Sequence, residues 1–227
     1  MLQLFAMKQS EHGNLDWLIM QLADSAFPAG GFAHSSGLEA AWQLGVIRNS
    51  TELAEYLRAQ LSQLCHASLP FVKRAYSTPG DLIAIDGACH AFLNNPIARR
   101  ASIVQGQAFV MAASKAFDVT ACQPLASLIR RKDIHGHWSP AFGALSNAMQ
   151  IDLETTLRLF LFVNTRGIVS AAVRLGIVGP LEGQFIQRNA LSLASLGEID
   201  DEPALTSPML DIWQGVQDRL YSRLFQS

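Results

Sequence analysis

The sequence predicts an all-α protein, a single helical-bundle domain of about ten helices. Apolar residues recur at spacings of three and four, as in Leu53, Leu57, Leu61 and Leu64, which places them on one face of a helix. No segment shows the sustained alternation of apolar and polar residues that a half-buried strand requires. Prolines also directly follow helix-capping residues, at the first helical position, where the missing N–H would be unpaired anyway. These three observations favour helices throughout.

The individual helices follow from their start signals. Asn49 followed by Glu52 has the spacing of a capping box. Four further starts carry proline at the first helical position, three of them behind a capping side chain: Asn95-Pro96, Ser139-Pro140, Ser207-Pro208 and Gly179-Pro180. With the apolar periodicity, these signals predict helices over residues 14–26, 35–45, 50–68, 70–77, 81–94, 96–117, 140–150, 152–176, 180–196 and 207–222.

Two predicted linkers, residues 130–139 and 197–203, are too short to separate independent domains. We therefore expect one domain over residues 1–227. Within it, residues 1–13 are expected to form a flexible N-terminus and residues 218–227 a partner-binding C-terminal tail.

Composition limits the function. Charged residues make up 16% of the chain, below the roughly 25% typical of soluble domains, so either the core is large or a partner covers part of the surface. A net charge of -2 offers no basic excess for a nucleic-acid backbone. Three cysteines without a Cys-x-x-Cys pair imply no disulfide framework. With no apolar stretch of about 20 residues to span a membrane, we expect a cytoplasmic protein.

A proline and two glycines interrupt the helical pattern within residues 24–39. Pro28 requires the preceding helix to end, and Gly30 and Gly31 permit a sharp turn. Ser36 and Glu39 have the spacing of a capping box for the next helix. The residues alone predict a helix–turn–helix joint.

Metal binding is a second hypothesis. His135 and His137 flank Gly136 in a predicted loop, but two ligands do not make a closed site. The adjacent pairs Cys65-His66 and Cys89-His90 would point about 100° apart on a helix, so each pair is poorly placed to bind one ion.

Two further segments stand out. Residues 166–181 combine small residues with Arg166 and Arg174, which are eight apart and thus near one helix face. The last residues are apolar and arginine-bearing, although chain ends are commonly polar. Such a tail either binds a partner, since Tyr and Arg are enriched at interfaces, or docks on its own domain.

Taken together, residues 24–39, 165–181 and 220–227 resemble the UreF family of urease accessory proteins, in the same order along the chain. The run of proline, double glycine and His-Ser-x-Gly-Leu-Glu is the most specific part. Residues 65–132 match the family only in their helical character. The resemblance implies an all-α protein that forms homodimers, binds UreD (called UreH in some organisms) and recruits the GTPase UreG.

The resemblance also implies that the assembly docks on apo-urease and helps to deliver nickel. On this hypothesis the chain is not an enzyme and holds no cofactor: nickel transits the complex, and the partner GTPase binds GTP. The absence of a Walker A loop agrees with this. The predicted partner-binding residues are Gly30, Gly31, His34, Ser35, Glu39, Arg166, Arg174, Arg219, Tyr221, Arg223, Leu224 and Phe225.

One rival hypothesis is a small all-α hydrolase or transferase that uses His34 and Ser35. The sequence lacks the Gly-x-Ser-x-Gly elbow of many serine hydrolases, and adjacent side chains on a helix diverge. A second rival is a helical regulator that binds a small apolar ligand in its core.

Overall fold

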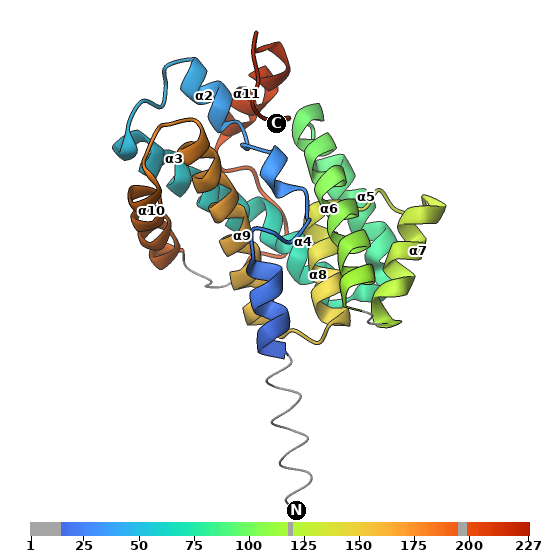
Figure 1. Ribbon diagram of the computed structural model, residues 1–227. Coiled ribbons are helices and arrows are strands. Elements are labelled where there is room, and N and C mark those ends of the chain that lie inside the picture. The colour runs from blue at the N-terminus through green and yellow to red at the C-terminus, as the bar shows by residue number, and fades with distance from the viewer. Residues whose placement is uncertain (1–14, 118–119, 195–198) are drawn as a thin grey trace, which may run out of the picture.

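The computed structural model describes residues 15–117, 120–194 and 199–227, and it confirms the all-α class (Figure 1). Within these ranges the regular secondary structure is helical, with no strand. One hydrophobic core joins residues from Leu15 to Phe225. The predicted flexible N-terminus, residues 1–13, lies outside the described residues.

The elements begin with a helix at residues 15–23. They continue as η1 (Gly31–Ala33), α2 (Leu38–Gln43), α3 (Ser50–Gln63), the π-helical η2 (Leu64–Ser68), α4 (Leu69–Ser77), η3 (Pro79–Asp81), α5 (Leu82–Phe92), α6 (Pro96–Ala116), η4 (Thr120–Cys122), α7 (Gln123–Arg131), α8 (Trp138–Ala148), α9 (Leu153–Arg174), α10 (Pro180–Leu193), α11 (Pro208–Val216) and η5 (Gln217–Arg219).

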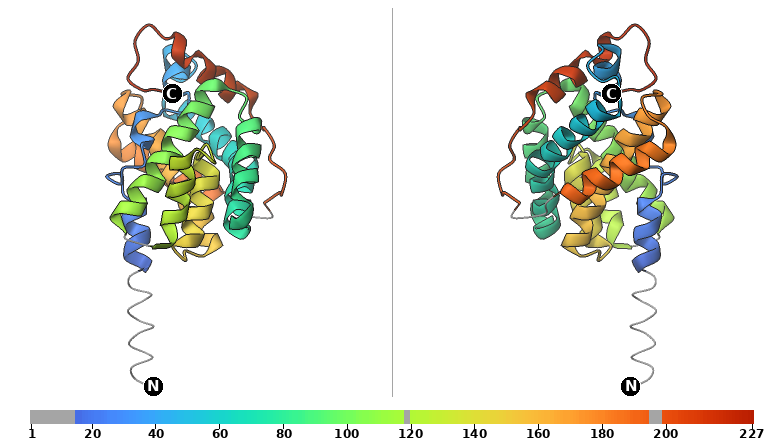
Figure 2. Two further views of the ribbon diagram at one scale, coloured as in Figure 1. Left: turned by 90° about the vertical axis from the view of Figure 1, so that its right-hand side faces the viewer. Right: turned by 90° about the vertical axis from the view of Figure 1, so that its left-hand side faces the viewer.

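Helix α8 lies at the centre of the bundle, between α4 and α6 (Figure 2). A side chain at Gly143 would clash with the Val72 carbonyl, so glycine is what allows α8 to approach the α4 backbone closely. On the other side, Phe142 of α8 stacks on Phe109 of α6, with ring centroids 5.1 Å apart, and meets Phe160 of α9 edge to face at 5.2 Å. This aromatic cluster fixes α6, α8 and α9 relative to one another.

Most helix starts are where the sequence signals place them, but α8 begins at Trp138 with His137 as its N-cap, two residues before the start predicted at Pro140. The side chains of Asn49 and Asn95 accept backbone N–H groups at the starts of α3 and α6, as predicted. Helix α9 is long and apolar enough to cross a membrane by length and composition alone, but 56% of the relevant window is buried inside the domain. It therefore has the character of a core helix.

Parts of the helix prediction differ from the structure. The prediction omits α7, although Leu125, Leu128 and Ile129 have the spacing of one helix face. The predicted helices 50–68 and 70–77 form one continuous helical segment, in which π-helical η2 joins α3 to α4. The predicted helix 207–222 ends as α11 at Val216, followed by the single turn η5 and a non-helical tail.

Candidate functional site

The joint at residues 24–39 forms a loop anchored to the aromatic core. Phe27 stacks on Phe117, with centroids 5.6 Å apart, and meets Phe109 edge to face at 5.9 Å. Gly30 adopts φ 74°, which confirms the predicted turn at that glycine. Gly31 instead opens the 3₁₀ turn η1, where an added side chain would press on Gln105.

The two arginines of α9 brace this loop at both ends. Arg166 donates to the carbonyl oxygen of Ala23, where the first helix ends. Arg174 donates to the carbonyl oxygen of Phe32 at 2.8 Å. The prediction that Arg166 and Arg174 share one helix face is therefore confirmed, and both side chains hold the chain's own backbone.

Arg174 also connects the loop to the C-terminal tail. Its guanidinium carbon lies 3.7 Å from the centroid of the Phe32 ring and 4.2 Å from that of the Phe225 ring. The cation is thus held between an aromatic ring of the loop and one of the tail. A flat guanidinium suits this position because it can stack on rings while its N–H groups bond in its own plane.

The Glu39 side chain holds the tail by binding the backbone of the tail. Its carboxylate accepts hydrogen bonds from the N–H groups of Leu224 at 2.6 Å and Phe225 at 3.1 Å, and from the Gln217 side chain at 2.6 Å. Glu39 is only 2% exposed. The capping box predicted for Ser36 and Glu39 is therefore wrong, because this carboxylate points at the tail rather than at the start of α2.

His34 and Ser35 complete the attachment at the last described residue. The hydroxyl of Ser35 donates to the Ser227 carbonyl at 2.9 Å, and the Nδ1 atom of His34 lies 2.7 Å from the Ser227 hydroxyl. Burial, followed by the nearby Arg100 charge, lowers the pKa of His34. The hydrogen-bond partner of the imidazole is thus Ser227 rather than Ser35, so this geometry does not assemble the nucleophilic pair of the rival hypothesis.

We call the attachment of residues 224–227 to the loop, through Glu39, Arg174, His34 and Ser35, the tail clamp. The predicted partner-binding residues include those four side chains but not two others that take part. Gln217 is fully buried beside Glu39, and Phe32 covers the Arg174 guanidinium. Phe32 lies within residues 24–39, whereas Gln217 directly precedes the predicted tail, residues 218–227.

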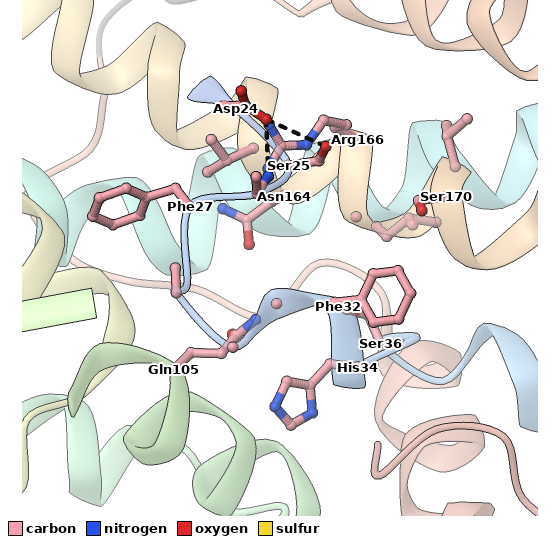
Figure 3. Close-up of a pocket in the computed structure, with 18 of the residues that line it drawn as sticks. Asp24, Ser25, Phe27, Phe32, His34, Ser36, Gln105, Asn164, Arg166 and Ser170 are labelled. Carbon is pink, nitrogen blue, oxygen red and sulfur yellow. Dashed lines mark hydrogen bonds between the residues drawn. The ribbon is translucent and has the colours of Figure 1, made fainter. Parts of the chain in front are cut away.

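Beside the tail clamp lies a cavity of about 980 Å³, bounded by the loop, α6, α9 and α10 (Figure 3). Arg166 and Arg174 of α9 and His34 of the loop line it, together with Gln105 of α6 and Gln187 of α10. Two buried polar atoms of these residues, Nε2 of His34 and Oε1 of Gln187, have no hydrogen-bond partner among the described residues. Five of the twelve predicted partner-binding residues line this cavity: Gly30, Gly31, His34, Arg166 and Arg174.

The tail presents another set of side chains to solvent. Phe225 is 3% exposed, whereas Tyr221 is fully exposed and Leu224 is 59% exposed. Arg223 pairs with Asp218 at 2.6 Å, and Asp218 also pairs with Arg100 of α6 at 2.9 Å. Arg219 is exposed as well. The alternative that the tail docks on its own domain is thus confirmed for Phe225, whereas partner binding by the exposed side chains stays a prediction.

The histidines predicted as metal-ligand candidates lie elsewhere, between α5 and the loop that precedes α8. Nε2 of His137 is 3.1 Å from Nδ1 of His90, and the His135 ring stacks on that of His90 with centroids 3.8 Å apart. His90 was considered only with its neighbour Cys89, so its place beside the other two was missed. In the conformation described, no three His, Cys, Asp or Glu side chains are arranged to hold a metal ion.

Asp86 holds this second loop in place. Its carboxylate, 1% exposed, accepts the N–H groups of His135, Gly136 and His137 at 2.7, 3.1 and 2.8 Å. Burial lowers the pKa of His137 to about 4, against the opposing effect of Asp86. Desolvation and the neighbouring His135 also lower the pKa of His90. Both rings are neutral at neutral pH.

Comparison with known proteins identifies relatives over most of the chain. The UreF family model matches residues 47–191. Urease accessory protein F of Arabidopsis thaliana is 35% identical over 228 residues, which cover 94% of this chain and 93% of that protein. The protein of the same name in Oryza sativa subsp. japonica is 35% identical, covering 92% and 84%. Urease accessory protein UreF of Paenarthrobacter aurescens is 28% identical, covering 92% and 96%.

Proposed function

The chain belongs to the UreF family of urease accessory proteins and so has a role in urease maturation, and on that premise we propose that it acts as a scaffold rather than as an enzyme. In this proposal it binds UreD (UreH), recruits the GTPase UreG and docks with them on apo-urease in the cytoplasm. Nickel then passes through the assembly, and GTP is bound by UreG. The chain itself holds neither as a cofactor.

One observation carries this proposal. The three segments that resemble the family, far apart in the sequence, meet at the tail clamp, where Glu39 and Arg174 hold the backbone and the Phe225 ring of the tail. Glu39, Arg174 and Ser35 each form hydrogen bonds with the chain's own backbone, and His34 pairs with the Ser227 hydroxyl. A fixed surface, rather than reacting groups, is what such an arrangement provides.

The outward side of the tail is the surface that we assign to UreD. Tyr221 and Leu224 are exposed there, and Met209 and Ile212 of α11 are 50% and 55% exposed. Tyrosine and methionine are enriched in the centres of protein interfaces. Because the clamp fixes the backbone at residues 224–225, less backbone entropy is lost there when a partner binds.

Exposed apolar side chains on α10 support the homodimer that we propose. Leu181, Phe185 and Leu193 of α10 are 88%, 63% and 67% exposed. Their spacing of four and eight residues places them along one side of the helix. An apolar row of this kind suits a contact with the same row of a second copy. For UreG, we propose the loop around the half-buried Gly30 and Gly31, where the Phe32 side chain is 69% exposed.

The decisive experiment is urease activation in cells that lack this chain, combined with a pull-down of UreD and UreG. Restored wild-type chain should activate urease and retain both partners. The Tyr221→Ala/Leu224→Ala variant should lose UreD at least about tenfold, as expected for two interface anchors.

The matched control is Ile83→Ala/Val104→Ala, which also removes two exposed apolar side chains but lies on α5 and α6. It should bind UreD like the wild type. Equal retention of UreD by the tail variant and this control would reject the assignment of the tail surface. A wild-type chain that turned over a substrate unaided and ignored both partners would reject the scaffold function.

A further inference from the structure

The three histidines between α5 and the loop before α8 are not used by the proposed scaffold function. His90 comes from α5, whereas His135 and His137 come from a loop 45 and 47 residues later. Asp86 lies one helical turn before His90 and binds three successive N–H groups of that loop. One buried carboxylate therefore fixes the loop against the helix that carries His90.

The facing nitrogens of His90 and His137 have the spacing of two ligands of one metal ion. Imidazole nitrogens bind such ions at about 2.0–2.1 Å. Two nitrogens 3.1 Å apart would then subtend roughly 95–100° at an ion equidistant from both, by that bond length. This angle lies between those of octahedral and tetrahedral coordination. In the conformation described, a hydrogen bond between the two rings occupies this position.

The hydrogen bonds of His137 leave a lone pair on Nε2, the nitrogen that would bind a metal. Its Nδ1 atom is 3.1 Å from the Ser102 hydroxyl, which also accepts the Trp138 N–H at 3.1 Å. A ring that donates from Nδ1 keeps its lone pair on Nε2, the atom that faces His90. Metal-binding histidines characteristically use the second ring nitrogen for a hydrogen bond of this kind.

His135 supplies a third donor after a side-chain rotation. Its ring is stacked on His90, so its nitrogens do not converge with the other two in the conformation described. The side chain is exposed, and the backbone is held by Asp86 and by Gln107, which donates to the His135 carbonyl at 2.9 Å. We infer that this exposed side chain rotates while the hydrogen bonds to Asp86 and Gln107 keep its backbone in place.

We propose that His90, His137 and His135 form a binding site for a divalent late transition-metal ion. The nitrogens of His90 and His137 already have the spacing of two ligands, and the His135 nitrogen binds the ion after its side chain rotates. Water occupies the remaining coordination positions. An all-imidazole set favours Ni²⁺, Cu²⁺ and Zn²⁺ over Mg²⁺ or Ca²⁺, which prefer oxygen ligands. The site is a property of the isolated chain, so it stands whether or not the proposed scaffold function is correct.

The test uses the purified full chain, freed of metal, and titrates Ni²⁺ or Zn²⁺ alone against a chromophoric chelator at pH 7.5. The wild type should bind one ion of either kind per chain, with no competition from excess Mg²⁺. His90→Ala should weaken binding at least about tenfold, the lower end of the loss seen even for second-shell changes. His135→Ala should also weaken it, and His66→Ala, which alters an exposed histidine on η2, should not.

Thermal unfolding in a metal chelator identifies any variant that has lost its fold. His90→Gln, which keeps a polar group facing His137, replaces His90→Ala if the latter does not fold. No ion bound by the wild type, or equal affinity in the wild type and the folded His90 variant, would overturn the proposal. In the second case the ion would lie at other ligands.

Discussion

Two buried carboxylates, Asp86 and Glu39, form the same kind of hydrogen bonds in different regions of the molecule. Each is at most 2% exposed, and each binds successive backbone N–H groups of a remote segment. Neither forms an ion pair with any described residue. Backbone N–H groups therefore take the place of a cation, which lets a charge stay buried without a lysine or arginine partner.

The difference lies in what each carboxylate holds. Asp86 fixes the loop at residues 135–137, which joins α7 to the central helix α8, so the bundle depends on it. Glu39 fixes residues 224–225, which lie in a non-helical segment after α11 and η5. Losing Glu39 can therefore release this segment while the helices remain packed. The same interaction is thus structural in a connecting loop and separable from the fold in the tail.

The largest expected effect is that of Asp86→Ala. Three buried N–H groups would lose their acceptor, and hydrogen bonds to a charged group contribute about 1.5–3 kcal/mol each but are not additive. We expect a loss of about 3–4 kcal/mol in the free energy of unfolding, measured by urea denaturation. Asp86→Asn, which keeps one acceptor oxygen, should lose less. Equal stability of the alanine variant and the wild type would remove Asp86 as the anchor of the loop.

Glu39→Ala should have a smaller effect on the bundle and a larger one on the tail. We expect a loss of about 2 kcal/mol in the free energy of unfolding. Trypsin should cleave after Arg219 and Arg223 much faster than in the wild type, because the tail backbone is no longer held. Tyr221→Ala, which alters only an exposed side chain, is the control for cleavage. Unchanged cleavage in Glu39→Ala would show that other clamp contacts suffice.

Acid should weaken the region around His137. The pKa of about 4 in the folded state is below the roughly 6.5 of an unfolded histidine. The unfolded chain therefore binds more protons between these values, and stability falls as the pH falls from 6.5 to 4. We expect a loss of about 1–3 kcal/mol over that window. His137→Gln should show a shallower dependence in parallel denaturation curves; an identical slope would contradict this.

Arg174→Lys should have the smallest effect on stability, less than about 1 kcal/mol. A lysine keeps the charge but cannot stack as a plane between Phe32 and Phe225. The change should appear mainly as faster cleavage of the tail, without a change in the unfolding of the bundle. Cleavage at the wild-type rate would mean that the charge alone, and not the stacked guanidinium, holds the Phe225 ring.

Local features of the fold could be read from the sequence because their causes are local. The caps at Asn49 and Asn95 and the turn at Gly30 depend on residues within a few positions of one another. Helix α7 also has a local signal, the i, i+3, i+4 spacing of Leu125, Leu128 and Ile129, which the prediction did not use. The shared face of Arg166 and Arg174 was predictable from helical geometry alone.

The site was only partly predictable. The sequence singled out His34, Ser35, Glu39 and the tail, but it assigned Glu39 to a helix cap and left the docking of the tail open. Those contacts join residues more than 180 positions apart, and a local pattern carries no information about which distant backbone will arrive. Whether these residues bind partners stays a prediction.

Local sequence is enough to show that this chain forms helices, where most of them begin, and which segments carry unusual residues. Periodicity and capping are properties of neighbouring residues, so they are set before the chain collapses. Only the packed structure shows that Glu39 faces the tail, that Asp86 faces a loop, and that His90 meets His137. The first contact depends on how α2 and α11 pack and the other two on how α5, α6 and α8 pack, and the core fixes both arrangements together.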